Sequence, residues 1–372
     1  MKLRNAKLIA AIGAATLAQF SLAGTDIFFE PLTQSAPVTA AGSAEELGSP
    51  WVTPAGISGV NLTSLQEIEA DIEQSIVRVP GLGTSATMID MVSFDPHGNF
   101  LFLPHETLVG AGVSRYDIAN DTSVVLFRGD TGGLSNNWAN DWGAFDPSTW
   151  TTNDTLFLAE EWSGLGRVIE VLNPMADPAD IEIRELESIA NVSHEGLRFS
   201  NDGRTLYFVD EDNSGSIYKL VLKNKHDYAA GGQTFVLKVD AFNGDASMTY
   251  NNSVNAKQPR TGSATWVALT DEEGNALTAT NPFDNAGGPG ARAGRKAADE
   301  IKGTPYGRPE DIEVGRLANG HEVVYFAATS ENAVYTIEMM PGKKASKAQV
   351  KVLLSETGTP KNAGFAGTTG KI

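Results

Sequence analysis

Carboxylates recur in this sequence where short apolar runs end, in a pattern that could hold metal ions. Glu106, Glu161 and Glu211 each follow closely after such a run. Carboxylate oxygens are the ligands that Ca²⁺ prefers, and one ion takes about six to eight oxygens. Carboxylates that converge repel one another unless cations neutralise them. The residues predicted to bind metal are Glu106, Glu161, Glu195, Asp210, Glu211 and Glu310.

Residues 193–222 show how strands could position these groups. Three apolar runs are separated by the turn Asn201–Asp202–Gly203 and by a second turn at Gly215. Such runs and turns are typical of antiparallel strands joined by tight hairpins. Glu195 stands just before the first run, and the acidic cluster 210–212 follows the second. We therefore expect the acids at strand ends, on one rim of an all-β scaffold.

The same unit of strand, turn, strand and acidic end recurs along the chain. Phe94, Phe145 and Phe199 mark its first three copies at intervals of about fifty residues, a period typical of β-propeller blades. The predicted fold class is all-β, a six-bladed β-propeller, with a sandwich or solenoid of the same strands as the alternative. The copies occupy residues 91–106, 142–161, 195–211 and 310–329.

Two parts of the predicted propeller are less regular. A unit missing between the third and fourth copies must include the apolar run 263–269. The sequence stops in turn-like residues at 368–372, so we expect a last blade that is either incomplete or closed by an N-terminal strand pair. The propeller domain is assigned to residues 84–372.

The first residues predict export. Residues 1–23 combine Lys2, Arg4 and Lys7 with a short apolar run and small residues up to Ala23, which is typical of a secretory signal peptide. A membrane anchor is the alternative, but the run is short for a bilayer span. The protein is therefore expected to be secreted or periplasmic.

Residues 24–83 predict an irregular strap that packs on the main body, or a solvated arm. The strap is rich in Ala, Ser, Thr, Pro and Gly. Within it, residues 64–74 have apolar side chains at helical spacing, and Ser64 and Glu67 predict a capping box at the start of a short helix.

Composition narrows the class of partner. The 372 residues include 46 acidic and 28 basic side chains, which gives a formal net charge of −18. An acidic surface disfavours nucleic acid and anionic membranes and suits cation binding, although solubility would also explain it. The chain has no cysteine, which excludes thiolate metal sites and cysteine nucleophiles.

Five motifs follow one another in a fixed order over about residues 85–340. They are His105–Glu106, the GAGVSRY segment 110–116, the WG…EEW block 142–162, the HEG…LYFVDED block 194–212 and the GRPEDIEV segment 307–314. This ordered set resembles the PhoX-type alkaline phosphatases. The resemblance implies a six-bladed propeller that hydrolyses phosphate monoesters at a cluster of calcium and iron ions near its axis. It also implies that the partner is a small phosphate ester or another anionic substrate.

The resemblance also implies roles for single residues. Arg308 precedes Glu310 as in the family's RPE motif, and a guanidinium there could brace a phosphate bidentately. The family usually carries an iron-binding cysteine before the WG pair, where this chain has Asn140 and Asp141. Calcium is therefore the expected cofactor, and any iron would have only oxygen and nitrogen ligands. The metal-binding roles fall on Glu106, Glu161, Glu195 and Glu310, with Asp210 and Glu211 at the acidic end of the third copy.

Three functions fit these observations. The first is a secreted metal-dependent phosphatase of the PhoX type. The second is a calcium-dependent lactonase or other esterase, because residues 198–212 also resemble blade motifs of that group. The third is a calcium-stabilised propeller that binds a partner without catalysis. Strand alternation predicts that Glu160, Asp212 and Glu313 face solvent instead of the site.

Overall fold

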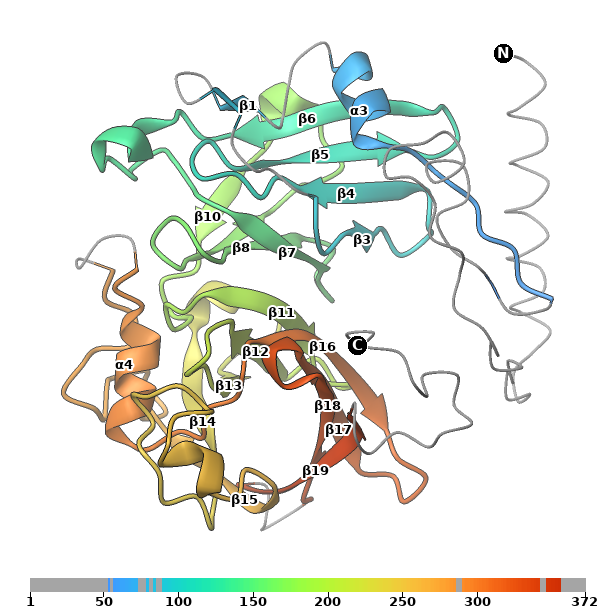
Figure 1. Ribbon diagram of the computed structural model, residues 1–372. Coiled ribbons are helices and arrows are strands. Elements are labelled where there is room, and N and C mark those ends of the chain that lie inside the picture. Colours follow the sequence, from blue (N-terminus) through green and yellow to red (C-terminus); the bar gives the residue numbers. More distant parts are fainter. Residues whose placement is uncertain are drawn as a thin grey trace.

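The structure is a computed structural model that describes Thr53 and residues 56–72, 78–79, 83–84, 89–285, 290–341 and 346–355. The chain is mostly β, as predicted, and its strands form antiparallel sheets (Figure 1). The predicted signal peptide and most of the predicted strap lie outside the described residues. No helix within the described ranges is long and apolar enough to cross a membrane.

Four meanders, each made of four consecutive antiparallel strands, follow one another along the chain. The predicted number of six blades is not confirmed. The first meander is β3 (Ser93–Phe94), β4 (Phe100–Pro104), β5 (Gly112–Asp117) and β6 (Thr122–Arg128), and the second is β7 (Phe145–Trp150), β8 (Leu156–Glu160), β9 (Val168–Val171) and β10 (Ile183–Glu185). The third is β11 (His194–Phe199), β12 (Thr205–Asp210), β13 (Ile217–Leu222) and β14 (Gly232–Val239), and the fourth is β16 (Pro309–Arg316), β17 (Glu322–Ala328), β18 (Ala333–Met339) and β19 (Lys347–Ser355).

Turn chemistry and strand composition explain these meanders locally. The hairpin between β11 and β12 turns at Gly203, whose φ of 69° suits a residue without a Cβ. Central strands such as β8, with the sequence LFLAE, are buried on both faces because neighbouring meanders cover them. The strand β19 pairs with β15 only over its first four residues, 347–350. Buried and solvent-facing residues alternate there, whereas the rest of β19 is largely exposed.

One strand breaks the propeller pattern. The run 263–269, expected to belong to a separate blade, forms the single strand β15 (Gly262–Ala268). β15 pairs with β14 on one side and with β19 on the other, which joins the third and fourth meanders into one nine-stranded sheet. This sheet curls until its edge strands, β11 and β16, meet. Their contact is close, since a Cβ built on Gly196 of β11 would lie 2.2 Å from Cγ2 of Ile312 in β16. The ring of strands is visible in Figure 1.

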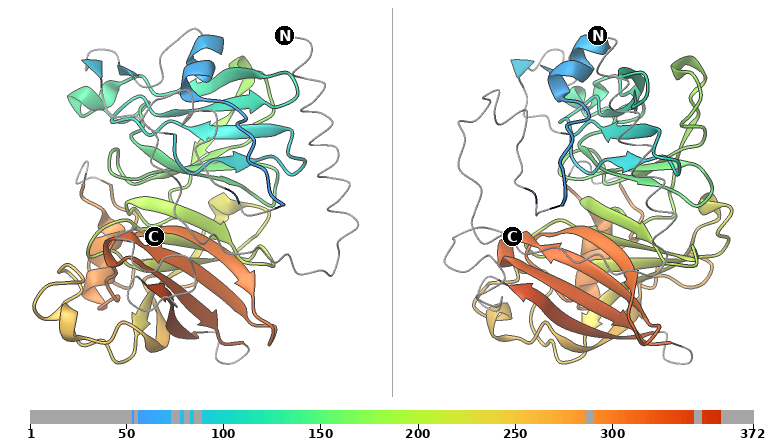
Figure 2. Two further views of the ribbon diagram at one scale, coloured as in Figure 1. Left: turned by 45° about the vertical axis from the view of Figure 1, so that its right-hand side comes forward. Right: turned by 90° about the vertical axis from the view of Figure 1, so that its right-hand side faces the viewer.

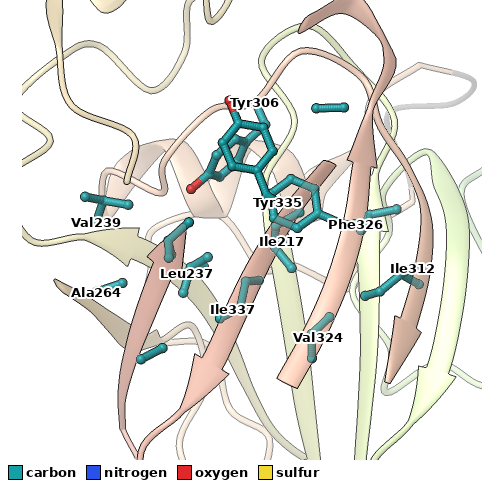
Figure 3. Packing of buried hydrophobic residues seen from close by; sticks show 14 of the residues in the cluster. Ile217, Leu237, Val239, Ala264, Tyr306, Ile312, Val324, Phe326, Tyr335 and Ile337 are labelled. Atoms are coloured by element: carbon teal, nitrogen blue, oxygen red, sulfur yellow. The ribbon is translucent and has the colours of Figure 1, made fainter. Parts of the chain in front are cut away.

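The meanders are held together by buried apolar clusters. Phe102 of β4 and Phe145 of β7 share a cluster between the first two meanders, and Phe157 of β8 and Phe208 of β12 share one between the second and third. The inside of the nine-stranded sheet is filled by a third cluster, in which the rings of Phe326 and Tyr335 stack with centroids 5.1 Å apart (Figure 3). Burial of each such aromatic side chain contributes about 1.5–3 kcal/mol. Figure 2 shows the first two meanders stacked on the nine-stranded sheet.

The predicted helix in the strap is confirmed as α3 (Leu65–Asp71). Ser64 is its N-cap, where the hydroxyl accepts a hydrogen bond from the backbone N–H of Glu67 at 3.2 Å and donates to the Glu67 carboxylate at 3.0 Å. Ile68 is 1% exposed and packs in a cluster with Leu101 and Leu103 of β4. This piece of the strap therefore packs on the first meander and is not a solvated arm.

A second helix is α4 (Ala293–Glu300). The surrounding stretch 287–296 is Gly-rich and basic, a composition typical of a flexible loop, but its C-terminal part begins this helix. Residues 287–289 lie outside the described ranges. A Cβ on Gly294 would lie 2.8 Å from Val192, so the helix packs closely on the segment between β10 and β11. The shorter elements are β1 (Arg78–Val79), β2 (Gly83–Thr84) and the 3₁₀ turns Gly132–Ser135, Pro178–Asp180, Tyr228–Ala230, Asn255–Lys257 and Thr329–Glu331.

Candidate metal centre

An irregularity in strand pairing recurs near the start of the first strand in three of the meanders. In β7, β11 and β16 the register shifts so that two residues oppose one on the neighbouring strand. The first extra residue is Asp146 in β7, Glu195 in β11 and Glu310 in β16. Such bulges re-aim a side chain away from the regular alternation of the strand. Each of these strands therefore presents one carboxylate at the same end of its meander.

A second set of acids comes just after the second strand of the first three meanders. Glu161 directly follows β8 and Glu211 directly follows β12, whereas Glu106 comes two residues after β4. Because each second strand runs antiparallel to the first, it ends where the first begins. In the fourth meander this position is occupied by Thr329, whose hydroxyl donates to Glu310 at 2.6 Å.

The two sets of carboxylates converge on one place. Three groups of three acids each have ligand oxygens that all lie within 4.8 Å of one another. Asp146, Glu161 and Glu195 each belong to two of these groups, so the groups are contiguous. The groups are Asp90–Asp146–Glu195, Glu106–Asp146–Glu161 and Glu161–Glu195–Glu211.

Burial and mutual repulsion perturb the whole cluster. Burial, followed by the charges of Asp146 and Glu161, raises the pKa of Glu195 well above its ordinary value. Burial and the proximity of Glu211 raise the pKa of Glu161 in the same direction. The raised pKa values mean that the carboxylates repel one another and have too few positive charges beside them. Bound cations would remove this repulsion.

Two oxygens of the cluster lack any hydrogen-bond donor among the described residues. Oε2 of Glu106 and Oδ1 of Asp146 are buried, on side chains that are each 3% exposed. Buried polar atoms are almost always satisfied, so an unsatisfied carboxylate oxygen indicates a missing ion or water. The donor set is entirely oxygen, which fits Ca²⁺. It does not fit iron–thiolate chemistry, because the chain has no cysteine.

Arg308 lies at the edge of this cluster. Its guanidinium pairs with Glu211 and, at 3.0 Å, with Glu310, and half of the side chain is exposed. The residue has φ of 51°, which a side chain other than Gly adopts only under constraint. The Arg308 guanidinium therefore bridges Glu211 and Glu310, although Glu310 belongs to none of the three groups of acids.

Asp210, the remaining predicted ligand, does not join the others. Arg295 of α4 donates to its two carboxylate oxygens, each at 2.6 Å, and the backbone N–H of Ser193 donates to it at 3.0 Å. The Asp210 side chain is fully buried. Its charge is thus balanced by a guanidinium, and Asp212 is bound by the same Arg295 at 3.0 Å.

Several neighbours of the cluster have structural partners of their own. Glu160 was predicted to face solvent, but it is fully buried and bound by Arg167 at 2.8 Å, so that prediction is wrong. Glu313 is 69% exposed, as predicted. Burial lowers the pKa of both His105 and His194 to about 3, which keeps the two imidazoles neutral. Arg292 donates to the carbonyl oxygen of Glu161 at 2.5 Å and supports the loop after β8.

Sequence reasoning missed Asp90 and Asp146. Asp146 precedes Pro147, and an Asp-Pro pair is ordinarily a turn former. Phe145, which marks the second copy of the repeat, begins β7, whereas Phe94 and Phe199 end β3 and β11. The residue that ends β7 is Trp150. When the copies are aligned on the last residue of each strand, one acid stands four residues before Phe94, Trp150 and Phe199 alike. These acids are Asp90, Asp146 and Glu195, so this spacing identifies Asp90 and Asp146.

Comparisons with known proteins do not assign this chain to a family. No family model matches the sequence, and no curated protein matches it either. Among solved structures, the chain is similar to an endo-arabinase from Bacteroides thetaiotaomicron, with TM-score 0.38 and 14% identity over 73% of this chain and 82% of that one. A structure of the nidogen/laminin complex follows with TM-score 0.32, 13% identity and coverage of 74% and 88%. The periplasmic gluconolactonase PpgL of Pseudomonas aeruginosa has TM-score 0.31, 14% identity and coverage of 72% and 53%. These TM-scores are low, and the similarities therefore support no statement about the site or the activity of this protein.

Proposed function

We propose that this protein is a metal-dependent hydrolase that binds calcium at the carboxylate cluster and cleaves an ester with an anionic group, first of all a phosphate monoester. The observation that carries the proposal is the set of three contiguous carboxylate groups, in which Asp146, Glu161 and Glu195 are shared. Shared carboxylates can bridge neighbouring cations. A site with several adjacent cations suits phosphoryl chemistry, in which the attacking and leaving oxygens are both stabilised.

The protein's own residues would contribute in three ways. Bound cations would polarise the ester and lower the pKa of a coordinated water, so that no covalent nucleophile is required. Asp146, Glu161 and Glu195 would hold those cations, and the unsatisfied oxygens of Glu106 and Asp146 are free to do so. Arg308, half-exposed beside Glu211, would offer a fixed fork of donors to the anionic group.

Two other functions remain to be separated from this one. A lactonase needs the cluster only to polarise one neutral carbonyl, and a binding propeller needs it only for stability. The discriminating experiment measures calcium and iron content of the purified protein, and then hydrolysis of 4-nitrophenyl phosphate and of a gluconolactone with and without a chelator. We expect more calcium than iron and chelator-sensitive phosphate release. Lactone hydrolysis without phosphatase activity would replace the first function by the second, and calcium binding without either activity would leave the third.

The matched variants are Glu195→Gln and Glu313→Gln. Glu195 is buried in the cluster, whereas Glu313 is 69% exposed and pairs with Arg198 of β11 at 3.3 Å. Both changes remove one charge and keep the size of the side chain. Loss of calcium in the first variant alone would support the site, and equal calcium content in both would contradict it.

A further inference from the structure

An exposed aromatic ring stands directly beside the carboxylate cluster. Trp162 follows Glu161 in the loop after β8, and its indole Nε1 donates a hydrogen bond to Oε1 of Glu106. Trp162 is nevertheless 44% exposed. A large aromatic ring that is fixed by a hydrogen bond and still open to solvent can accept a ligand with little loss of side-chain entropy.

The neighbouring loop presents a second apolar side chain. Ser163 donates its hydroxyl to the carbonyl oxygen of Leu108 at 2.5 Å, which ties the loop after β8 to the loop after β4. Leu108 is 38% exposed. Two loops from adjacent meanders are thus tied together next to the cluster, and each carries an exposed apolar side chain.

We propose that Trp162 and Leu108 form a platform for an aromatic ring in the alcohol part of the substrate, whose anionic end faces the carboxylate cluster. The inference rests on the proposed function and narrows its substrate class to aryl esters. Aromatic pairs contribute affinity beyond the area that they bury. The hydrogen bond from Nε1 to Glu106 sets the distance between ring and metal ligands, so that one molecule can reach both.

The chemistry of the platform favours an aryl group over a sugar. A sugar ring also stacks on tryptophan, but its hydroxyls require polar partners when they are desolvated. The hydroxyl of Ser163 already donates to a carbonyl, and the indole N–H already donates to a carboxylate. Leu108 adds a second surface without polar atoms, which suits a ring that has no hydroxyl groups.

The test compares two phosphonates that cannot be hydrolysed as esters. Calcium binding is measured first by equilibrium dialysis, and the binding of phenylphosphonate and of methylphosphonate to the calcium-loaded protein is then measured by calorimetry. We expect phenylphosphonate to bind about tenfold more tightly than methylphosphonate. Trp162→Ala should reduce this ratio to about twofold or less, while Trp162→Phe keeps most of it because a ring remains.

The controls separate this inference from the proposed function. Met175 is 45% exposed, much like Trp162, but it lies in the turn after β9, at the opposite end of the second meander. Met175→Ala should therefore leave the ratio of the two phosphonate affinities unchanged. Absence of calcium binding would overturn the proposed function. Calcium binding with an equal phenyl preference in wild type and Trp162→Ala would overturn the platform alone. Glucose 6-phosphate binding more tightly than phenylphosphonate would also contradict the aryl class.

Discussion

Arg295 holds both carboxylate oxygens of Asp210, through Nε and a terminal nitrogen, each at 2.6 Å. Asp210 directly precedes Glu211 at the end of β12, yet the two carboxylates have different partners. One anchors α4 to the third meander, and the other faces the carboxylate cluster. Adjacent acids in a strand end point to opposite sides, which is why one pair of neighbours can serve structure and site separately.

This relationship predicts that Asp210→Asn costs stability and spares the metal. Removing one partner of a buried ion pair leaves the other charge unsatisfied and typically costs about 3–5 kcal/mol. Because Arg295 is 20% exposed, water can offset part of this, and we expect a loss of about 2–3 kcal/mol in the free energy of unfolding. Urea unfolding and calcium analysis measure the two effects. Normal stability with reduced calcium would instead make Asp210 a ligand.

Glu195→Gln is expected to do the opposite. It removes a charge from a group of like charges, so the metal-free protein should be no less stable than wild type. The same change removes a ligand that two of the three groups share, so calcium content and any hydrolysis should fall. Glu313→Gln is the control, and it should change neither property. A strong destabilisation of metal-free Glu195→Gln would show that this carboxylate has a structural partner.

Calcium should stabilise the folded protein, and a chelator should reverse the effect. Binding to the folded state alone adds about 2.7 kcal/mol when free calcium exceeds Kd a hundredfold. The melting temperature should therefore fall in excess chelator and recover on addition of Ca²⁺. An identical melting curve with and without chelator would contradict a shared metal site.

The metal-free protein should lose stability as pH rises from about 6.5 to 8. Burial and like charges raise the folded-state pKa of Glu161 and Glu195, so the folded protein retains protons that the unfolded chain has lost. Stability from these groups is complete below the ordinary carboxylate pKa and is lost as pH rises toward the raised values. The two buried histidines change stability only below this window, because their folded-state pKa is lowered to about 3. Thermal melts in chelator test the slope, which should be smaller in Glu195→Gln. A rising melting temperature over this range would contradict the prediction.

Gly196→Ala should disturb the closure of the nine-stranded sheet. The added methyl would lie 2.2 Å from Cγ2 and 2.7 Å from the backbone nitrogen of Ile312, and the backbone atom cannot move aside by a rotamer change. Overpacking of this kind typically costs about 1–3 kcal/mol. Gly59→Ala is the control, because the nearest atom there is a Thr53 methyl carbon at 3.9 Å. Equal stability of the two variants would show that β11 and β16 are not in tight contact.

The sequence by itself predicted the local structure and most of the acids. Strands and hairpins follow from short apolar runs and from glycine turns such as Gly203, and α3 follows from Ser64 and Glu67, because these signals act over a few residues. Glu106, Glu161 and Glu211 were found for the same reason, since each stands just after a strand.

Tertiary structure decided what local patterns do not contain. Whether Asp210 or Glu211 faces the cluster depends on α4, which brings Arg295 from a distant part of the chain. Asp146 was hidden because a bulge, and not the Asp-Pro turn, determines its direction. The residues of β15 are apolar like those of any strand, and only pairing with both β14 and β19 made them a link between two meanders instead of a blade. In each case the outcome depends on long-range pairing and charge balance, which no short stretch of sequence encodes.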